Sequence, residues 1–411
     1  MLKTTFCGFN GFDLLEKVKN PLKYIWNKSE ITDLSADIEM TGKKPAVTKS
    51  KNTTVIKPEE ILAPNETEDV HACIATLKDL TMVKVYGNDD GFLILSSLRV
   101  KEPGKFVSAC TLKDKTVTVF DNRVYLNDKE SLQGETIYST DAPVICVGGT
   151  DDILILAEEK KLKVIRVFPK VSLARELAVD FNVTAVSCGK EHTLLLTSSG
   201  TVYSFGGGSR GQLGLGHIEN REEPCILEDL AGVKISHVEA GGWHSLAVSE
   251  LGDLYVWGWN ESGQLGLPCR NISTLHPPPE RKENYQMVSP TPAPNNGTWF
   301  TPVYLENTES GLCHAYIQRV DPVQIQSEPC VLDLGEDVNV VKVACGSRHS
   351  AAVTADGQLL TCGWNDYGQL CHQDVYSRDY FQTVDYFLQN KMTVKDVFCG
   401  PWSTIILTSQ H

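Results

Sequence analysis

One spacing of glycines occurs three times in the chain and limits what the chain can fold into. In each copy, four glycines are separated by 11, 6 and 5 positions. The copies are Gly189, Gly200, Gly206 and Gly211; Gly241, Gly252, Gly258 and Gly263; and Gly346, Gly357, Gly363 and Gly368. Because chance does not keep three such intervals fixed, the glycine spacing indicates a repeated structural unit.

Each copy predicts a β-hairpin. An alternating apolar run follows the first glycine and another follows the second, and such short runs are typical of strands. The tripeptide between the runs ends in glycine, where a tight turn favours a residue that adopts positive φ. One hairpin cannot bury its faces alone, and the 52 residues from Gly189 to Gly241 are a period typical of propellers and solenoids. We therefore expect each unit to be a propeller blade.

Two further positions are fixed in the repeat. A histidine follows the first glycine by three positions, at His192, His244 and His349. Gln-Leu-Gly or a near variant follows the fourth glycine, starting at Gln212, Gln264 and Gln369. Over roughly residues 183–411 this pattern resembles the repeat of the regulator of chromosome condensation family. The resemblance implies an all-β fold, a seven-bladed β-propeller.

Two other propeller repeats compete with this interpretation. WD-type blades of about 40–45 residues carry a Gly-His and Trp-Asp signature, and no Trp-Asp dipeptide occurs in the sequence. Kelch blades run about 50 residues, and Gly241-Gly242 suits their double glycine. The histidine and the Gln-Leu-Gly element recur between copies whereas the double glycine does not, which argues against kelch.

The two ends of the chain predict how the ring closes. Residues 1–15 resemble the second half of a repeat, and the residues from Phe398 onward resemble the first half. An N-terminal strand that pairs with a C-terminal strand leaves no open edge in a propeller. We therefore expect residues 1–411 to form a single propeller that is closed by this pairing.

Between the ends the repeats vary in quality. Well-formed repeats cover residues 183–268 and 325–411, and degenerate blades are expected over 70–182. Anchors near Ala75, Cys110, Gly149, Gly189, Gly241, Gly346 and Gly400 give a count of seven. Residues 41–65, rich in Lys, Thr, Pro and Glu, predict a mobile loop. Residues 269–324 hold either a hidden blade or an inserted loop; proline runs and the missing glycine spacing favour the loop.

Composition excludes several classes of function. The 52 acidic and 38 basic residues give a net charge of −14, which should repel nucleic acid, so direct DNA binding is not expected. The N-terminus lacks the pattern of a secretory signal, and no apolar stretch is long enough to span a bilayer, so we expect an intracellular protein. The 13 cysteines lack metal-type spacing and are expected to be reduced packing residues.

Catalytic motifs are not found either. The sequence has no His-Glu-x-x-His and no P-loop, and the repeat explains Gly206-Gly207-Gly208. His192, His244 and His349 could be taken for a metal triad, but equivalent positions in different blades are held apart by the ring. We expect these histidines to pack strands, and we expect no catalytic residue, metal or cofactor.

Binding residues are expected where the repeats differ in bulky loop residues. The candidates are Arg210, Trp243, Trp259, Asn260, Arg348, Trp364, Asn365 and Trp402. Aromatic residues and arginines in loops at one end of a rigid ring favour a protein-binding face, because interface hot spots are rich in Trp, Tyr and Arg. The plainer alternative is that each tryptophan fills a gap between blades.

What the family resemblance implies about function leaves three hypotheses. The founding member is a guanine nucleotide exchange factor for the small GTPase Ran, but its catalytic and histone-contacting loops have no identifiable counterpart in this sequence. A closer similarity to one small family member implies instead a non-enzymatic, nuclear, chromatin-linked partner of a JmjC-domain oxygenase, a histone demethylase or arginyl hydroxylase. That role concerns histone methylation and chromosome segregation, with the cytoplasm as a second location. The third hypothesis is a scaffold for an unrelated partner, such as cytoskeletal or ubiquitin machinery.

Overall fold

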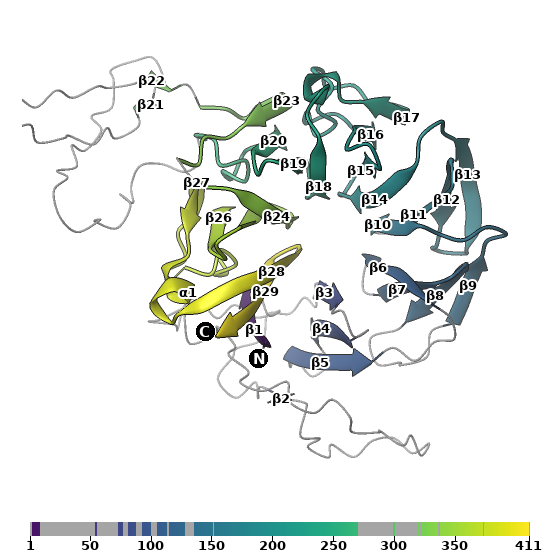
Figure 1. The fold of residues 1–411 in the computed structure, drawn as a ribbon, viewed down its shortest axis with the longest axis horizontal. Coiled ribbons are helices and arrows are strands. Elements are labelled where there is room, and N and C mark those ends of the chain that lie inside the picture. Colours follow the sequence, from purple (N-terminus) through teal and green to yellow (C-terminus); the bar gives the residue numbers. More distant parts are fainter. Residues whose placement is uncertain are drawn as a thin grey trace, which may run out of the picture.

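Antiparallel sheets are arranged around a ring in the computed structural model (Figure 1). It describes residues 2–8, 54–55, 73–76, 81–87, 93–99, 105–112, 115–127, 135–150, 152–269, 299–300, 319–320, 322–335, 338–372 and 374–410. Among them, six sheets have four strands and one has three, so the described chain forms seven blades. This confirms the predicted all-β propeller.

Apart from β2 (Thr54–Val55), which comes from the predicted mobile loop 41–65, the strands of the first blades come from residues 70–182, where degenerate blades are expected. One sheet has the order β2-β5-β4-β3, with β3 (Cys73–Thr76), β4 (Thr81–Gly87) and β5 (Leu93–Arg99). The next consists of β6 (Phe106–Leu112), β7 (Lys115–Phe120), β8 (Arg123–Asn127) and β9 (Glu135–Ser139). The third consists of β10 (Cys146–Thr150), β11 (Ile153–Glu158), β12 (Lys161–Arg166) and β13 (Ser172–Ala178).

The later blades come from the repeats with the fixed glycine spacing. They are β14 (Val183–Cys188), β15 (His192–Thr197), β16 (Val202–Gly206) and β17 (Arg221–Ile226); β18 (Ile235–Ala240), β19 (His244–Ser249), β20 (Leu254–Trp259) and β23 (Ile325–Val331); and β24 (Val340–Cys345), β25 (His349–Thr354), β26 (Leu359–Gly363) and β27 (Arg378–Thr383). The predicted hairpin is the middle strand pair of each. Its turn glycines take positive φ, at 81°, 96° and 84° for Gly200, Gly252 and Gly357.

The last blade joins the two ends of the chain. Its order is β1 (Leu2–Gly8), β29 (Ser403–Gln410) and β28 (Met392–Gly400). β1 runs antiparallel to β29, with Leu2 opposite Ser409 and Gly8 opposite Ser403. The innermost strands contact one another in a closed order, β3, β6, β10, β14, β18, β24, β28 and back to β3. The predicted closure by terminal strands is therefore confirmed.

The long interval between the second and third well-formed repeats interrupts a blade. β20 pairs directly with β23, so residues 270–321 are inserted between the third and fourth strands of that blade. Within them the structure describes only the pair of β21 (Trp299–Phe300) and β22 (Arg319–Val320). Of the predicted mobile loop, 41–65, all but β2 lies outside the described residues.

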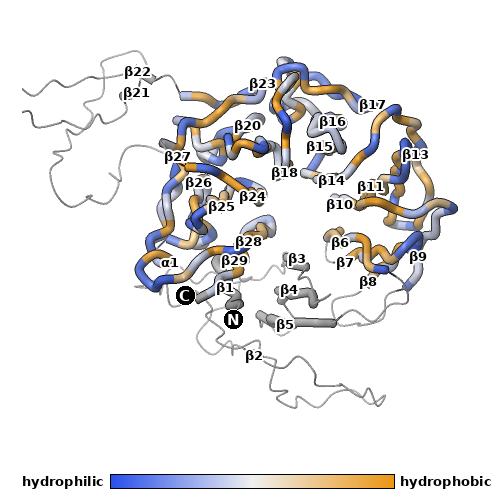
Figure 2. Tube along the Cα trace, viewed as in Figure 1, coloured by the Kyte–Doolittle hydropathy of each residue, from blue (hydrophilic) through white to orange (hydrophobic). Residues whose placement is uncertain are grey.

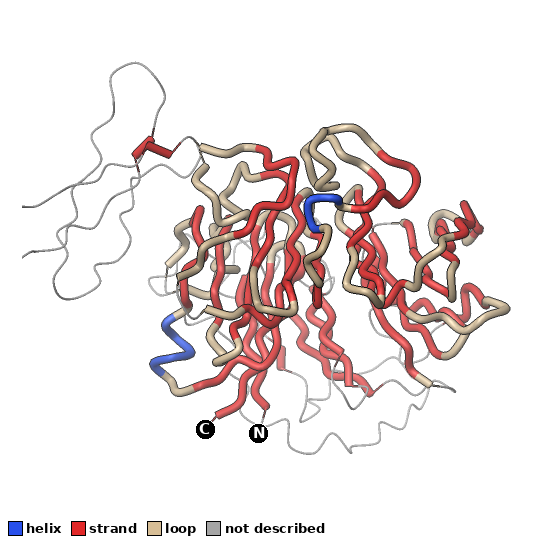
Figure 3. Tube along the Cα trace, turned by 45° about the horizontal axis from the view of Figure 1, so that its top comes forward, coloured by secondary structure: helices blue, strands red, loops and turns tan. Residues whose placement is uncertain are grey.

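Among the described residues, helix is limited to two short elements, drawn in blue in Figure 3. The two helical elements are the 3-10 helix η3 (Glu228–Leu230) and α1 (Asp385–Gln389). Among the described residues, no helix has the length and hydrophobicity that crossing a membrane requires.

The hydrophobic core lies between neighbouring blades. All six residues of β15, of β19 and of β25 are buried. Leu246 and Val256 of one blade belong to the same buried cluster as Val343 and Ala352 of the next. In Figure 2 the strands β6, β7 and β10 are largely hydrophobic, whereas the rim near α1 is hydrophilic. Because each blade buries both faces, no blade has a complete core without its neighbours.

Buried histidines link the blades through hydrogen bonds. Nε2 of His192, His244 and His349 lies 2.8, 2.9 and 3.0 Å from the hydroxyl oxygens of Ser245, Ser350 and Thr404, respectively. Each hydroxyl belongs to the next blade and donates back to the carbonyl of Gln212, Gln264 or Gln369 in the histidine's own blade. A hydroxyl has one proton, so it accepts from the histidine, and the neutral ring carries its proton on Nε2.

The same contact explains the first glycine of the spacing. A Cβ on Gly241 would lie 2.2 Å from Cε1 of the His244 ring, and Gly189 and Gly346 have the same relation to their own histidines. The histidine thus occupies the space that a side chain would need. Glycine and histidine recur together because the ring packs directly on the backbone three positions before it.

Burial keeps these histidines neutral. Removal from water lowers the pKa of His192 and of His244 to about 3 and that of His349 to about 4. The three side chains therefore act as hydrogen-bond donors inside the ring, in line with the predicted structural role.

The third glycine of the spacing yields a test of backbone crowding. Gly258 has φ 106°, and a Cβ there would lie 2.6 Å from the Trp243 carbonyl oxygen. Gly335 has φ 101° with nothing within 4 Å. Both alanine variants bear backbone strain of about 1–3 kcal/mol, but we expect Gly258→Ala to lose a further ~1–3 kcal/mol through collision. Equal losses for Gly258→Ala and Gly335→Ala in denaturant unfolding would contradict this account.

The buried histidines also predict how stability depends on pH. Their folded pKa values lie below the unfolded value of about 6.5, so between pH 6.5 and about 4 the unfolded chain binds more protons. The free energy of unfolding should therefore fall as the pH falls through this window, by up to about 1.4 kcal/mol per pH unit for each histidine. Urea unfolding at several pH values measures the slope, which His244→Gln should reduce; an unchanged slope would count against the argument.

Candidate protein-binding surface

Six of the predicted binding residues come together at one end of the ring. We call them the arginine–tryptophan belt: Arg210, Trp243, Trp259, Arg348, Trp364 and Trp402. Trp243, Arg348 and Trp402 lie between the first and second strands of successive blades, whereas Arg210, Trp259 and Trp364 lie at or after the end of the third strand. In an antiparallel blade these two kinds of connection lie at the same end. All six side chains are half-buried.

One half of the belt is built around two perpendicular indoles. The rings of Trp243 and Trp259 are 5.6 Å apart between centroids, with an angle of 90° between their planes. The Arg210 guanidinium carbon lies 4.7 Å from the Trp243 ring and 4.9 Å from the Trp259 ring. Arg210 comes from the preceding blade, so this contact crosses a blade boundary.

Arg348 extends the belt to the next blade. Its guanidinium carbon lies 4.8 Å from the Trp259 ring, and its Nη1 lies 3.3 Å from a carboxylate oxygen of Glu261. The Arg348 carbonyl accepts a hydrogen bond from the Trp364 amide at 2.9 Å. The Arg348 side chain is 36% exposed and that of Glu261 38%, so the pair remains accessible to a partner.

The other half of the belt is a cluster of three aromatic rings. Trp364 lies 4.9 Å from Trp402 and 4.9 Å from Tyr367, at 76° in both cases. Asp366, between Trp364 and Tyr367 in the chain, is exposed. Each cation–π or aromatic pair contributes about 0.5–1.5 kcal/mol, so the belt is held in shape before any partner arrives.

The alternative that tryptophans fill gaps between blades holds for a different residue. Trp257 is fully buried, and its Nε1 donates to the Gln212 carbonyl of the preceding blade at 3.0 Å. The belt tryptophans keep part of their surface exposed. Their arrangement is that of interface hot spots, large rigid groups with guanidinium groups among them.

Two predicted binding residues are misassigned. Asn260 and Asn365 are both 0% exposed, so the prediction that they contact a partner is wrong. Asn260 Nδ2 donates to the carbonyls of Leu267 and Val323, which pins both ends of the inserted segment, and its Oδ1 accepts from the Leu265 amide. Asn365 makes the equivalent bonds in its own loop. Their function is to shape the loops that carry the belt.

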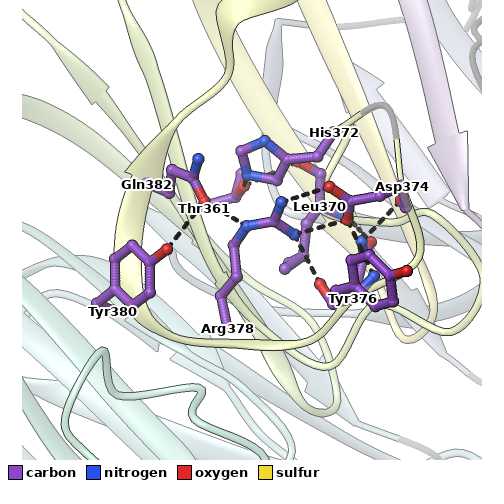
Figure 4. A network of polar contacts seen from close by, with 9 residues as sticks. Thr361, Leu370, His372, Asp374, Tyr376, Arg378, Tyr380 and Gln382 are labelled. Atoms are coloured by element: carbon purple, nitrogen blue, oxygen red, sulfur yellow. Dashed lines mark hydrogen bonds and ion pairs between the residues drawn. The ribbon is translucent and has the colours of Figure 1, made fainter. Parts of the chain in front are cut away.

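An arginine pins the loop that follows Trp364 (Figure 4). Arg378 is only 6% exposed and donates to both carboxylate oxygens of Asp374, at 3.0 and 2.7 Å, and to the Tyr376 carbonyl. Burial alone would raise the pKa of Asp374, but the bonds and charge of Arg378 hold it below its usual value. Burial, aided by Arg378, lowers the pKa of the neighbouring His372 to about 3. This network fixes the outer wall of the blade that carries Trp364.

Tyr367 is a belt neighbour that the candidate residues omitted. Relative to the glycine spacing it occupies the position of Arg210 and of Ser262, directly before the fourth glycine. Alignment of the three copies at this position shows an arginine, a serine and a tyrosine. This difference between the copies is the sequence signal that could have identified Tyr367 as part of the surface.

Two observations concern metal-ligating and nucleophilic side chains among the described residues. No group of three or more His, Cys, Asp or Glu side chains among them is placed to hold a metal ion. The ten cysteines whose side chains the structure describes are free thiols, and burial raises the pKa of Cys146 and of Cys188 to about 12, so these two thiols stay protonated. The geometry of the belt suits binding.

Comparisons with known proteins agree with the fold. One profile of the Regulator of chromosome condensation (RCC1) repeat matches residues 199–248, 252–289 and 356–407, and a second matches 183–212, 235–264 and 340–369. The chain is similar to RCC1 domain-containing protein 1 of Homo sapiens, with 38% identity over 283 residues, 68% of this chain and 71% of the human protein. The Mus musculus protein of that name is 41% identical over 250 residues, 60% of each chain.

Solved structures show the same architecture. Prp20p of Saccharomyces cerevisiae aligns with a TM-score of 0.58 and 15% identity over 84% of this chain and 82% of its own. In complex with Kap60, yeast RCC1 (Prp20) gives a TM-score of 0.59, also at 15% identity. At this identity the likeness concerns the fold alone.

The repeat profiles cover the glycines that shape the blades, and the human relative is 38% identical over 71% of its length. The chain therefore belongs to the regulator of chromosome condensation (RCC1) repeat family.

Proposed function

We propose that the chain is a non-enzymatic propeller adaptor that binds a JmjC-domain oxygenase through the arginine–tryptophan belt. The observation that carries the proposal is the belt itself. Half-buried tryptophans and arginines from neighbouring blades are preorganised by cation–π contacts at one end of a rigid ring. Such residues supply most of the binding energy at protein interfaces.

The choice of partner follows from the family. Similarity to a small member of the repeat family favours a nuclear, chromatin-linked role in histone methylation and chromosome segregation, in which the oxygenase carries the iron. The relatives named RCC1 domain-containing protein 1 support this branch of the family. Histones would be reached through the oxygenase, which acts on them, and the net charge of −14 disfavours direct contact with DNA.

A second candidate is nucleotide exchange on a Ran-like GTPase. The crystal structure of Prp20p was reported together with its binding to Gsp1p and histones, and its fold is shared. Against this role, residues 70–182 depart from the repeat, and their sequence has no identifiable counterpart of the exchange loops.

Capture from nuclear and cytosolic extract tests the proposal. The intact protein should recover a JmjC oxygenase, and Arg210→Ala/Arg348→Ala should reduce the recovery at least about tenfold, because hot-spot arginines contribute more than about 1–2 kcal/mol each. The matched control is Arg166→Ala/Arg175→Ala, which removes two arginines from β12 and β13 at the outer part of another blade.

The control should bind as the intact protein does, and both variants should show cooperative unfolding. Recovery of a small GTPase without an oxygenase would overturn the adaptor proposal in favour of exchange activity, to be followed by nucleotide-release kinetics. Recovery of the oxygenase by both double variants alike would place its binding site outside the belt.

A further inference from the structure

Two neighbouring blades present the same pair of side chains, an indole and a carboxylate. Trp259 follows Gly258 directly and Glu261 comes two residues later; Trp364 follows Gly363 and Asp366 comes two residues later. The first pair holds a guanidinium: Arg348 lies 4.8 Å from the Trp259 ring and 3.3 Å from the Glu261 carboxylate. The repeat thus contains a working example of a guanidinium site.

In the second pair a tryptophan takes the place of the arginine. Arg348 directly precedes the second strand of its blade, and the equivalent residue one blade further is Trp402, directly before β29. Trp402 meets Trp364 at 4.9 Å, and Tyr367 adds a third ring. Over the described residues, no arginine or lysine lies against Trp364 or Trp402, and none forms an ion pair with Asp366.

The second site remains accessible and its carboxylate lacks a cation. Trp364 and Trp402 are half-buried and Asp366 is exposed. Partial desolvation raises the pKa of Asp366, and the hydrogen bond with the Trp364 side chain offsets this only in part. A cation that reached the carboxylate would favour its charged form.

We propose that Trp364, Asp366 and Trp402 bind the guanidinium of an arginine in a basic segment of the partner protein. The planar guanidinium stacks on indole rings and bonds a carboxylate through two N–H groups, which the ammonium of lysine does not reproduce. The net charge of −14 attracts a basic segment to the ring. This inference rests on the proposed binding role of the belt and names the chemistry that the belt recognises.

Titration with short peptides tests the site without the partner. The probes are three blocked octapeptides of alternating glycine with arginine, with lysine or with citrulline, the neutral isostere of arginine. The readouts are tryptophan fluorescence and calorimetry at low ionic strength. The arginine peptide should bind at least about tenfold more tightly than the citrulline peptide and more tightly than the lysine peptide.

Two variants locate the binding. Asp366→Asn removes the carboxylate and should lower the affinity for the arginine peptide several-fold. Trp402→Arg places a guanidinium at the position that Arg348 occupies in the preceding blade. The site should then be filled by the protein's own side chain, and the affinity for the arginine peptide should fall at least about tenfold. The matched control is Glu250→Gln, which removes one exposed carboxylate from the hairpin turn at the other end of the ring and should change little.

Equal binding of the arginine and citrulline peptides, or equal weakening by Asp366→Asn and Glu250→Gln, would overturn the inference. If Trp402→Arg fails to fold, the surface variant Asp366→Asn still decides. Capture of an oxygenase through the belt, with no arginine-specific peptide binding, would leave the adaptor proposal standing and remove only this inference. Arginine-specific peptide binding without capture of an oxygenase would support the guanidinium site and remove the proposal that the partner is an oxygenase.

Discussion

The ring depends on the hydrogen bond that each buried histidine makes to a hydroxyl of the next blade. Because that hydroxyl donates back to a carbonyl of the histidine's own blade, three of the seven blade boundaries each hold a buried bridge of two hydrogen bonds. The binding residues are attached to these bridges, since Trp243 and Arg348 directly precede His244 and His349. The preorganised side chains of the belt therefore extend from backbone positions that the buried bridges hold in place.

Much of the fold could be predicted because glycine spacing reports backbone geometry directly. The turn at Gly252 and the ring packed on Gly241 need glycine in every copy, so the pattern survives where side chains change. The early blades keep no such pattern: Gly149 packs against Leu112 and Cys110, and apolar contacts of this kind leave no fixed spacing. The sequence of 70–182 therefore predicts degenerate blades but does not mark where one blade ends and the next begins.

The candidate site was only partly predictable for a related reason. Bulky loop residues such as Trp259 and Arg348 mark a surface, and the structure brings them together. Asn260 looks equally polar and equally placed in sequence, but its side chain is buried and donates to one carbonyl of its own loop, Leu267, and to one beyond the insertion, Val323. The sequence shows which positions vary between repeats. It does not show the direction of each side chain, because this depends on backbone groups from as far away in the chain as Val323.

Pairing of β1 with β29 delays closure of the ring until synthesis has reached β29. Leu2 is synthesised before Ser409 and has to wait for it, its partner in the strand pair. At about 5–20 residues per second, roughly 20–80 s separate the two. For that time the last blade is incomplete and the ring is open, with an unpaired strand edge at its seam. The newly made chain is then a substrate for chaperones and for aggregation, and its exposure ends when the C-terminal strand arrives.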